Sequence, residues 1–223
     1  MPSHTSRPDD AVAAESESAF DVRARHTLIT GKPPRIPPLA PDEFGPEVYE
    51  ISAKLRPAGT ATDTPQPAVE VSEMAATLMH HPAVSRQHFE LGLQLLRSGT
   101  LSARERELAV LRTAWLCKAP FVWGEHVKLG KKAGLTSEDI ERITHGSAAT
   151  GWEEHDRAIV GAAEELHADA MISDATWAVL SRRLDKKQLI ELPMLVGQYH
   201  TVTYYQNTLR FRLLPGNPGL SAR

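Results

Sequence analysis

Cysteine is nearly absent from this sequence of 223 residues, which contains only Cys117. A single thiol cannot form a disulfide within the chain, and it cannot supply a cysteine-rich zinc site. This usage is typical of a protein in a reducing compartment, and we predict a cytoplasmic location.

A basic surplus and long apolar runs are also lacking. The chain has 25 Lys and Arg against 28 Asp and Glu, for a formal net charge of −3. Dedicated nucleic-acid binders normally carry a clear basic excess, so we expect no nucleic-acid partner. No stretch approaches the ~20 apolar residues of a membrane span, and acidic residues interrupt the first 30 residues where a signal peptide would need an apolar segment. We therefore expect no membrane partner.

Proline is scarce after residue 67, because 11 of the 16 prolines precede that point. Proline fixes φ and has no N–H group, so long helices are excluded from the first part of the chain. We predict a disordered or loosely attached tail over residues 1–30 and a Pro-rich extended arm over 31–67. A helical domain is expected over 68–213, followed by a C-terminal tail over 214–223.

The helical domain shows apolar residues at helical spacing and no sustained alternation of period two. Ser102 and Glu105 form a capping box, which predicts a helix from this point to about Leu116. Asp174 is expected to cap a later, short helix. The other expected helices cover residues 83–97, 120–133, 136–146, 153–170 and 185–208. The sequence therefore predicts an all-α fold.

Two of these helices carry the most informative pair of side chains. Glu107 shares a helix face with Val110 and Leu111, and His126 shares one with Trp123. A short turn joins the two helices, so they should lie antiparallel with these faces together. A carboxylate and an imidazole that meet in an apolar cleft can exchange a proton near neutral pH. Periodicity alone favours the alternative that Glu107 and His126 form a buried pair with the purely structural role of linking the two helices.

Three short runs surround this pair: LSARERELAVLR at 101–112, WGEHV at 123–127 and AGLT at 133–136. They resemble the carboxymuconolactone decarboxylase family, which includes the alkylhydroperoxidase D proteins. The resemblance extends over about residues 33–210. It implies an AhpD-like helical bundle with a Pro-rich N-terminal arm, and a protein that usually assembles as a homo-oligomer.

The peroxidase branch of this family uses a Cys-x-x-Cys pair followed, four residues later, by a histidine. The matching positions here are Ala119 and Val122, and Cys117 lies two residues before the first of them. A lone thiol cannot form the internal disulfide of a dithiol peroxidase. The decarboxylase branch needs no cysteine, so the resemblance implies instead that Glu107 and His126 are catalytic, without a cofactor.

Five further residues are candidates for contact with a substrate. Trp123 is expected to form a wall of the pocket, and Val122 stands where many family members carry an acidic residue, which indicates a pocket rebuilt for another ligand. Arg112 is the best candidate to bind an anion, through paired N–H donors. Tyr199 and His200 could line the pocket from the last helix, although an aromatic core or an oligomer seam explains them more simply.

No metal site is expected, because His80 and His81 are adjacent, point in different directions and have no partner ligands spaced nearby. The sequence thus predicts a cofactor-independent, carboxy-lyase-like enzyme acting on a small unsaturated or carbonyl-containing acid or lactone. The reaction would be an enolate-type proton transfer, such as decarboxylation, isomerisation or elimination, with His126 as the acid and base. The alternatives are a thiol-dependent peroxide reductase of the alkylhydroperoxidase D type and a non-catalytic oligomeric binding module.

Overall fold

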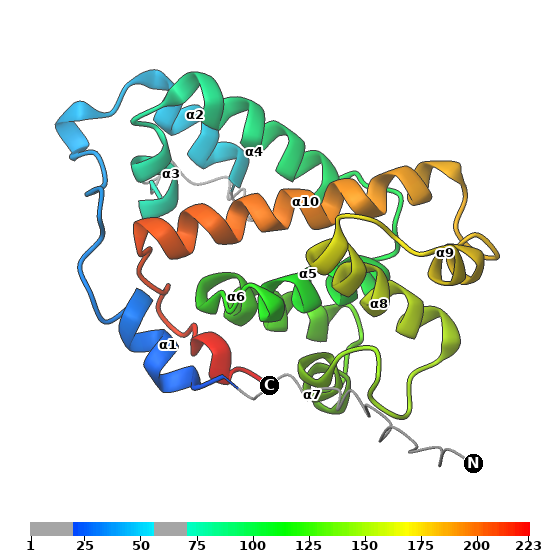
Figure 1. The fold of residues 1–223 in the computed structure, drawn as a ribbon. Coiled ribbons are helices and arrows are strands. Elements are labelled where there is room, and N and C mark those ends of the chain that lie inside the picture. The colour runs from blue at the N-terminus through cyan, green and yellow to red at the C-terminus, as the bar shows by residue number, and fades with distance from the viewer. Residues whose placement is uncertain (1–19, 56–70) are drawn as a thin grey trace, which may run out of the picture.

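The computed structural model describes residues 20–55 and 71–223, and Figure 1 shows their arrangement. Most of the expected N-terminal tail and the last part of the Pro-rich arm lie outside these residues. The described chain contains helices and no strand, which confirms the all-α prediction. The elements are α1 (Val22–Ile29), η1 (Pro41–Glu43), α2 (Pro46–Leu55), α3 (Glu73–Leu78), α4 (Pro82–Arg97), α5 (Ala103–Leu116), α6 (Pro120–Lys132), α7 (Ser137–His145), α8 (Glu154–Asp169), α9 (Asp174–Leu180), α10 (Lys186–Leu209) and η2 (Gly219–Ser221).

Side-chain caps set several of the helix starts. Ser102 accepts a hydrogen bond from the backbone N–H of Glu105, whose own carboxylate accepts from the N–H of Ser102, so the expected capping box opens α5. Thr136 caps α7 in the same manner. The cap of α9 is Ser173 and not Asp174, which is the first residue of the helix.

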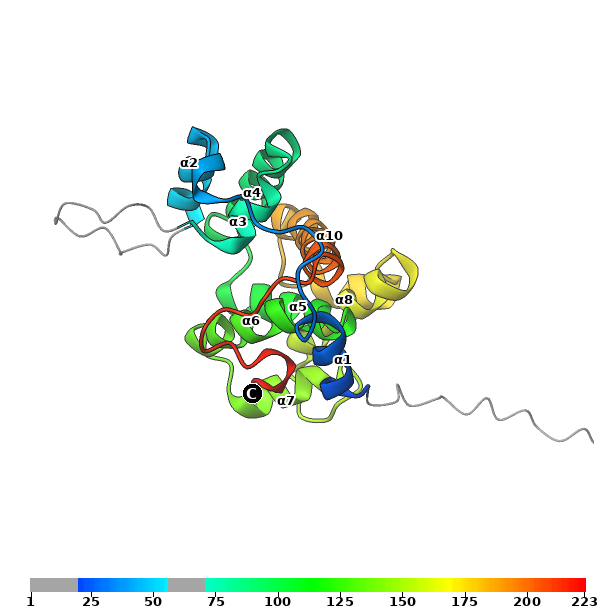
Figure 2. The same cartoon turned by 90° about the vertical axis from the view of Figure 1, so that its left-hand side faces the viewer.

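The long helix α10 lies between two groups of helices, as Figures 1 and 2 show. On one side are α2, α3 and α4, and on the other are α5, α6 and α8. Helix α5 is central and packs against α6, α7, α8 and α10. Its residues Leu108 and Leu111 are fully buried in the larger apolar core, while a second, smaller core joins Val48 and Ile51 of the arm to Phe89 of α4. In the described residues, no helix has both the length and the apolarity to cross a membrane.

The segment after α10 differs from the tail expected over 214–223. It returns beneath α6, where the indole Nε1 of Trp123 donates to the carbonyl oxygen of Ala222 at 3.1 Å. The side chain of Asn217 donates to the carbonyl oxygen of Phe121 at 3.1 Å. The N–H of Leu220 donates to Nε2 of His26 at 3.0 Å, which links this segment to α1. Apolar contacts with the larger core fix the chain here, so it is part of the folded domain.

Substitution of a glycine of α6 tests this packing. A Cβ at Gly124 would overlap the side-chain amide of Asn217, so Gly124→Ala should displace the C-terminal segment. We expect it to destabilise the protein by about 1–3 kcal/mol, which for a chain of this size lowers Tm by several degrees. Calorimetry or thermal unfolding followed by circular dichroism measures this change.

Gly197→Ala is the matched control. This glycine lies inside α10, and a Cβ there would meet nothing within 4 Å apart from its neighbours and the backbone of its own helix. The control should be neutral or stabilising by up to ~1 kcal/mol, because alanine favours helix. Equal stabilities of the two variants would contradict the proposed role of the C-terminal segment.

Candidate functional site

The sharp turn between α5 and α6 brings Glu107 and His126 together. Lys118, in the turn, adopts a left-handed backbone conformation with φ of 50°, which allows the chain to reverse within three residues. Nδ1 of His126 lies 2.7 Å from Oε2 of Glu107. Glu107 is fully buried and His126 is only 8% exposed, so this hydrogen bond is shielded from water.

The carboxylate of Glu107 has a second partner. Nε of Arg106 donates to its Oε1 at 3.1 Å. Burial by itself raises the pKa of Glu107, but the imidazole of His126 and the guanidinium of Arg106 outweigh this effect and hold the pKa below its usual value. An ionised carboxylate only accepts hydrogen bonds, so Nδ1 of His126 is the donor and Nε2 is the nitrogen available to a ligand.

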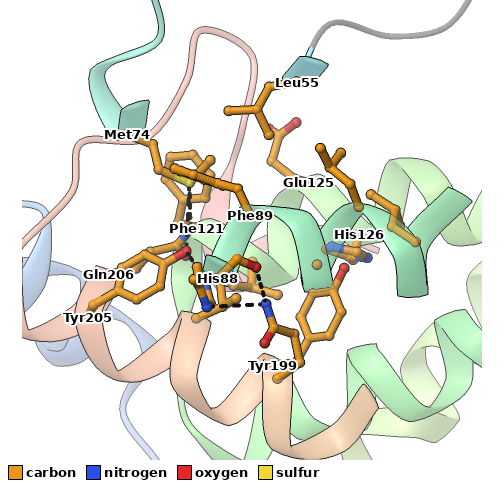
Figure 3. Close-up of a pocket in the computed structure, with 16 residues that line it drawn as sticks. Leu55, Met74, His88, Phe89, Phe121, Glu125, His126, Tyr199, Tyr205 and Gln206 are labelled. Carbon is orange, nitrogen blue, oxygen red and sulfur yellow. Dashed lines mark hydrogen bonds between the residues drawn. The ribbon is translucent and has the colours of Figure 1, made fainter. Parts of the chain in front are cut away.

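His126 lies at one end of a cavity of about 170 Å³ between α4, α6 and α10 (Figure 3). Leu55, Phe89, Phe121 and Val122 contribute apolar walls. Glu125 also lines this cavity, and no Lys or Arg does so among the residues that the structure describes. The space is therefore mainly apolar, with an imidazole edge presented at one end.

Tyr199 of α10 meets the ring of His126 edge-on. Their ring centroids lie 4.9 Å apart with an interplanar angle of 88°. Burial and the nearby charge of Glu107 both raise the pKa of the Tyr199 hydroxyl, so it stays protonated and able to donate. Figure 3 shows this hydroxyl directed towards His126, at the same end of the cavity.

A second polar group lines the cavity farther from His126. Nε2 of Gln198 lies 3.2 Å from Nδ1 of His88 and therefore donates to it. Nε2 of His88 then carries the proton and lies 3.3 Å from the hydroxyl of Tyr205. Burial lowers the pKa of His88, which favours this neutral form. Sequence reasoning missed His88 and Tyr205, because no local spacing connects residues on α4 and α10.

Part of the chain that contains the Glu107–His126 pair matches a known protein family. Residues 82–165 match the model of the carboxymuconolactone decarboxylase family. The similarity concerns this segment and not the whole chain. The segment includes α4, α5 and α6 and thus both members of the Glu107–His126 pair. No curated protein matches the chain.

Solved structures of AhpD-like proteins share the fold of this chain. A protein of unknown function from Agrobacterium tumefaciens, for which an AhpD-type antioxidant role has been suggested, is 18% identical with a TM-score of 0.56, over 61% of this chain and 94% of its own. The AhpD core of a peroxidase-related protein from Ralstonia eutropha is 17% identical with a TM-score of 0.57, over 65% and 77%. The debrominase Bmp8 is 9% identical with a TM-score of 0.59, over 82% and 94%. At these identities the likeness shows the fold alone.

Only some of the expected contact residues line the cavity. Val122 and Tyr199 line it, whereas Trp123, Arg112 and His200 do not. Trp123 is fully buried against the C-terminal segment, one residue away from the wall that Phe121 and Val122 provide.

Arg112 and His200 are engaged elsewhere. Nε of Arg112 donates to Glu164 at 2.8 Å, and its Nη1 donates to the carbonyl oxygens of Ile143 and Thr144. The guanidinium thus joins α5 to α7 and α8, which corrects its expected position as an anion-binding group in the pocket. His200 points to His167 of α8, with 2.9 Å between their ring nitrogens.

Acid titration tests the electrostatics of the Glu107–His126 pair. The pKa of Glu107 is lower in the folded protein than its ordinary value of about 4.5. The ionised carboxylate therefore stabilises the fold at pH values above 4.5, and this stabilisation is lost as the pH falls below 4.5. The free energy of unfolding of the wild type should therefore exceed that of Glu107→Gln near pH 6, and the difference should shrink below pH ~4.5. Urea denaturation at a series of pH values measures both.

The control variant is Glu138→Gln, at an exposed glutamate on α7. Its stability should follow that of the wild type at each pH, because exposed ion pairs contribute little. A constant difference between wild type and Glu107→Gln down to pH 3 would contradict the assigned ionisation of Glu107.

Proposed function

We propose that this protein is an enzyme that moves a proton at a carbon atom next to a carbonyl group of a small, mainly apolar substrate, using side chains alone. The observation that carries the proposal is the Glu107–His126 hydrogen bond at the end of an apolar cavity. The match of residues 82–165 to the decarboxylase family supports the same reaction class.

His126 acts as both base and acid in this reaction. Its Nε2 lone pair removes a proton from the carbon, and the electrons of the C–H bond move to the carbonyl oxygen to give an enolate. Glu107 stabilises the imidazolium that forms, because its carboxylate accepts the Nδ1 proton at 2.7 Å. Return of the proton to a different carbon of a conjugated substrate completes an isomerisation, and loss of a leaving group completes an elimination.

Tyr199 stabilises the negative charge on the enolate oxygen. Its hydroxyl is a donor that the raised pKa keeps protonated, and it lies at the same end of the cavity as His126. A fixed donor in a site shielded from water is worth more than in solution, because no solvent has to reorganise as the charge develops.

The size and lining of the cavity limit the substrate. A cavity of about 150 Å³ is known to hold a benzene-sized molecule, so the ~170 Å³ here suits a compound with one ring. No described lining residue is a Lys or Arg, and the carboxylate of Glu125 already pairs with Lys128, which does not line the cavity. These features favour an uncharged lactone or enone over a substrate with several carboxylates, and hence isomerisation or elimination over decarboxylation.

The peroxide reductase alternative receives no support from Cys117. The thiol does not line the cavity. Burial raises its pKa above the usual value, which lowers the fraction of nucleophilic thiolate at neutral pH.

Deuterium exchange tests the proposed chemistry even where the final product is unidentified. The protein would be incubated in D₂O with a panel of small unsaturated lactones, cyclic enones and keto acids, and deuterium at the carbon next to the carbonyl followed by NMR. We expect exchange with at least one uncharged lactone or enone. His126→Ala should slow it by ~10²–10⁴-fold, and Tyr199→Phe by up to ~10²–10³-fold.

His155→Ala provides a matched control, because Nε2 of this histidine also lies 2.7 Å from a buried glutamate, Glu105, but away from the cavity. It should lose stability and keep the exchange rate, measured well below its Tm. Exchange that persists in His126→Ala, or that is equally lost in a folded His155→Ala, would exclude the proposed role of His126. Absence of exchange by the wild type on the whole panel would favour a binding module.

We also propose that the protein is a homo-oligomer. Ile190 and Met194, one turn apart on α10, are 64% and 48% exposed, and Ile36 of the arm is exposed as well. Light scattering should give a multiple of the 24.5 kDa chain mass, and the double variant Ile190→Glu, Met194→Glu should shift it towards the monomer with unchanged helix content. A monomeric mass of the wild type at working concentration would contradict this proposal.

A further inference from the structure

Three side chains that can bind a metal converge where the end of α5 meets α8 and α10. They are Cys117, His167 and His200, and one ligand atom from each lies within 4.8 Å of the other two. None of the three lines the cavity beside His126. Two consecutive residues of α10 face these two sites. Tyr199 contacts His126 beside the cavity, and His200 contacts His167.

The hydrogen bonds of His200 leave one ring nitrogen ready to bind a metal. Its Nδ1 lies 2.9 Å from the carbonyl oxygen of Val196, which only accepts, so Nδ1 carries the proton. Nε2 is therefore the nitrogen with the lone pair, and it lies 2.9 Å from Nδ1 of His167. Metal-binding histidines commonly donate their other ring N–H to a backbone carbonyl in this way, which fixes both the tautomer and the ring orientation.

We propose that Cys117, His167 and His200 form a binding site for a zinc-type divalent cation. The ligand atoms would be the sulfur of Cys117, Nδ1 of His167 and Nε2 of His200. One thiolate and two imidazoles are a donor set that suits zinc, and three protein ligands leave the fourth tetrahedral position for water.

The rearrangement that binding requires is small. Zinc lies about 2.0–2.3 Å from nitrogen and sulfur ligands, so ligand atoms around one ion are roughly 3.5 Å apart. The 2.9 Å contact of His167 with His200 must open slightly, and the widest separation in the group, at most 4.8 Å, must close by about 1 Å. His167 is exposed, so rotation of its side chain can supply this movement.

Proton balance follows from the present hydrogen bonds. The thiol of Cys117 loses its proton to solvent when the sulfur binds the ion. Nδ1 of His167 gives up the proton that it shares with Nε2 of His200, and His200 keeps its own proton on Nδ1. Binding thus releases protons, so the affinity should rise with pH, and no oxidant or reductant is needed.

Cobalt(II) is the probe, because a tetrahedral site with a thiolate ligand gives a sulfur-to-cobalt charge-transfer band together with visible d–d bands. The reduced full-length protein should show both bands, saturating at one cobalt per chain, and Zn²⁺ should abolish them by displacement. Cys117→Ser should lack the charge-transfer band. Removal of a residue that only orients a metal ligand typically weakens metal binding by ~10–100-fold. His167→Ala removes a ligand itself, so it should weaken cobalt binding by more than this.

The control is His145→Ala, at an exposed histidine on α7, which should bind cobalt as the wild type does. A second measurement needs no variant: Zn²⁺ should slow the reaction of Cys117 with a thiol reagent. Wild-type protein without a charge-transfer band at excess cobalt, a band that persists in Cys117→Ser, or a rate of thiol modification unchanged by Zn²⁺ would each overturn the proposal.

Discussion

The hydrogen bond between Glu107 and His126 is the interaction on which the arrangement of the site depends. A fully buried carboxylate on α5 would be costly without partners, and His126 and Arg106 together provide them. The same bond fixes the imidazole in one orientation and one tautomer, with its other nitrogen available at the cavity. This one contact thus offsets the cost of burying Glu107 in α5 and orients His126 for proton transfer.

A second pair in the same domain shows that this chemistry does not make a site on its own. Glu105 and His155 lie 2.7 Å apart and are also buried, yet neither lines the cavity. The carboxylate of Glu105 closes the capping box of α5, so this pair joins a helix start to α8. What distinguishes Glu107 and His126 is the unfilled space beside them, which results from how α4 and α10 pack over α6.

The sequence predicts the features that short-range patterns determine. Helix positions follow from apolar spacing and caps, and the meeting of Glu107 with His126 follows from the short turn between their helices. The far wall of the cavity could not be predicted, because His88 and Gln198 are 110 residues apart and meet only through tertiary packing. Periodicity predicts that Trp123 forms a wall of the pocket, but Phe121 and Val122 form it. One residue turns a helix by about 100°, and the sequence does not show which other element packs against each face of the helix. Arg112 is predicted to bind a substrate anion, because nothing in the sequence indicates that Glu164 pairs with it. The sequence predicts no metal because no ligands are spaced nearby, and the three side chains of the proposed site come from distant parts of the chain.

The C-terminal segment beneath α6 has a consequence for biosynthesis. Its contact with α1 joins Leu220 to His26, which are 194 positions apart. During translation α5 and α6 leave the ribosome before this segment, so the indole of Trp123 lacks its hydrogen-bond acceptor until Ala222 has emerged. Because contacts between distant parts of a chain are slow to form, we expect the contacts of this segment with Trp123 and His26 to form late in folding.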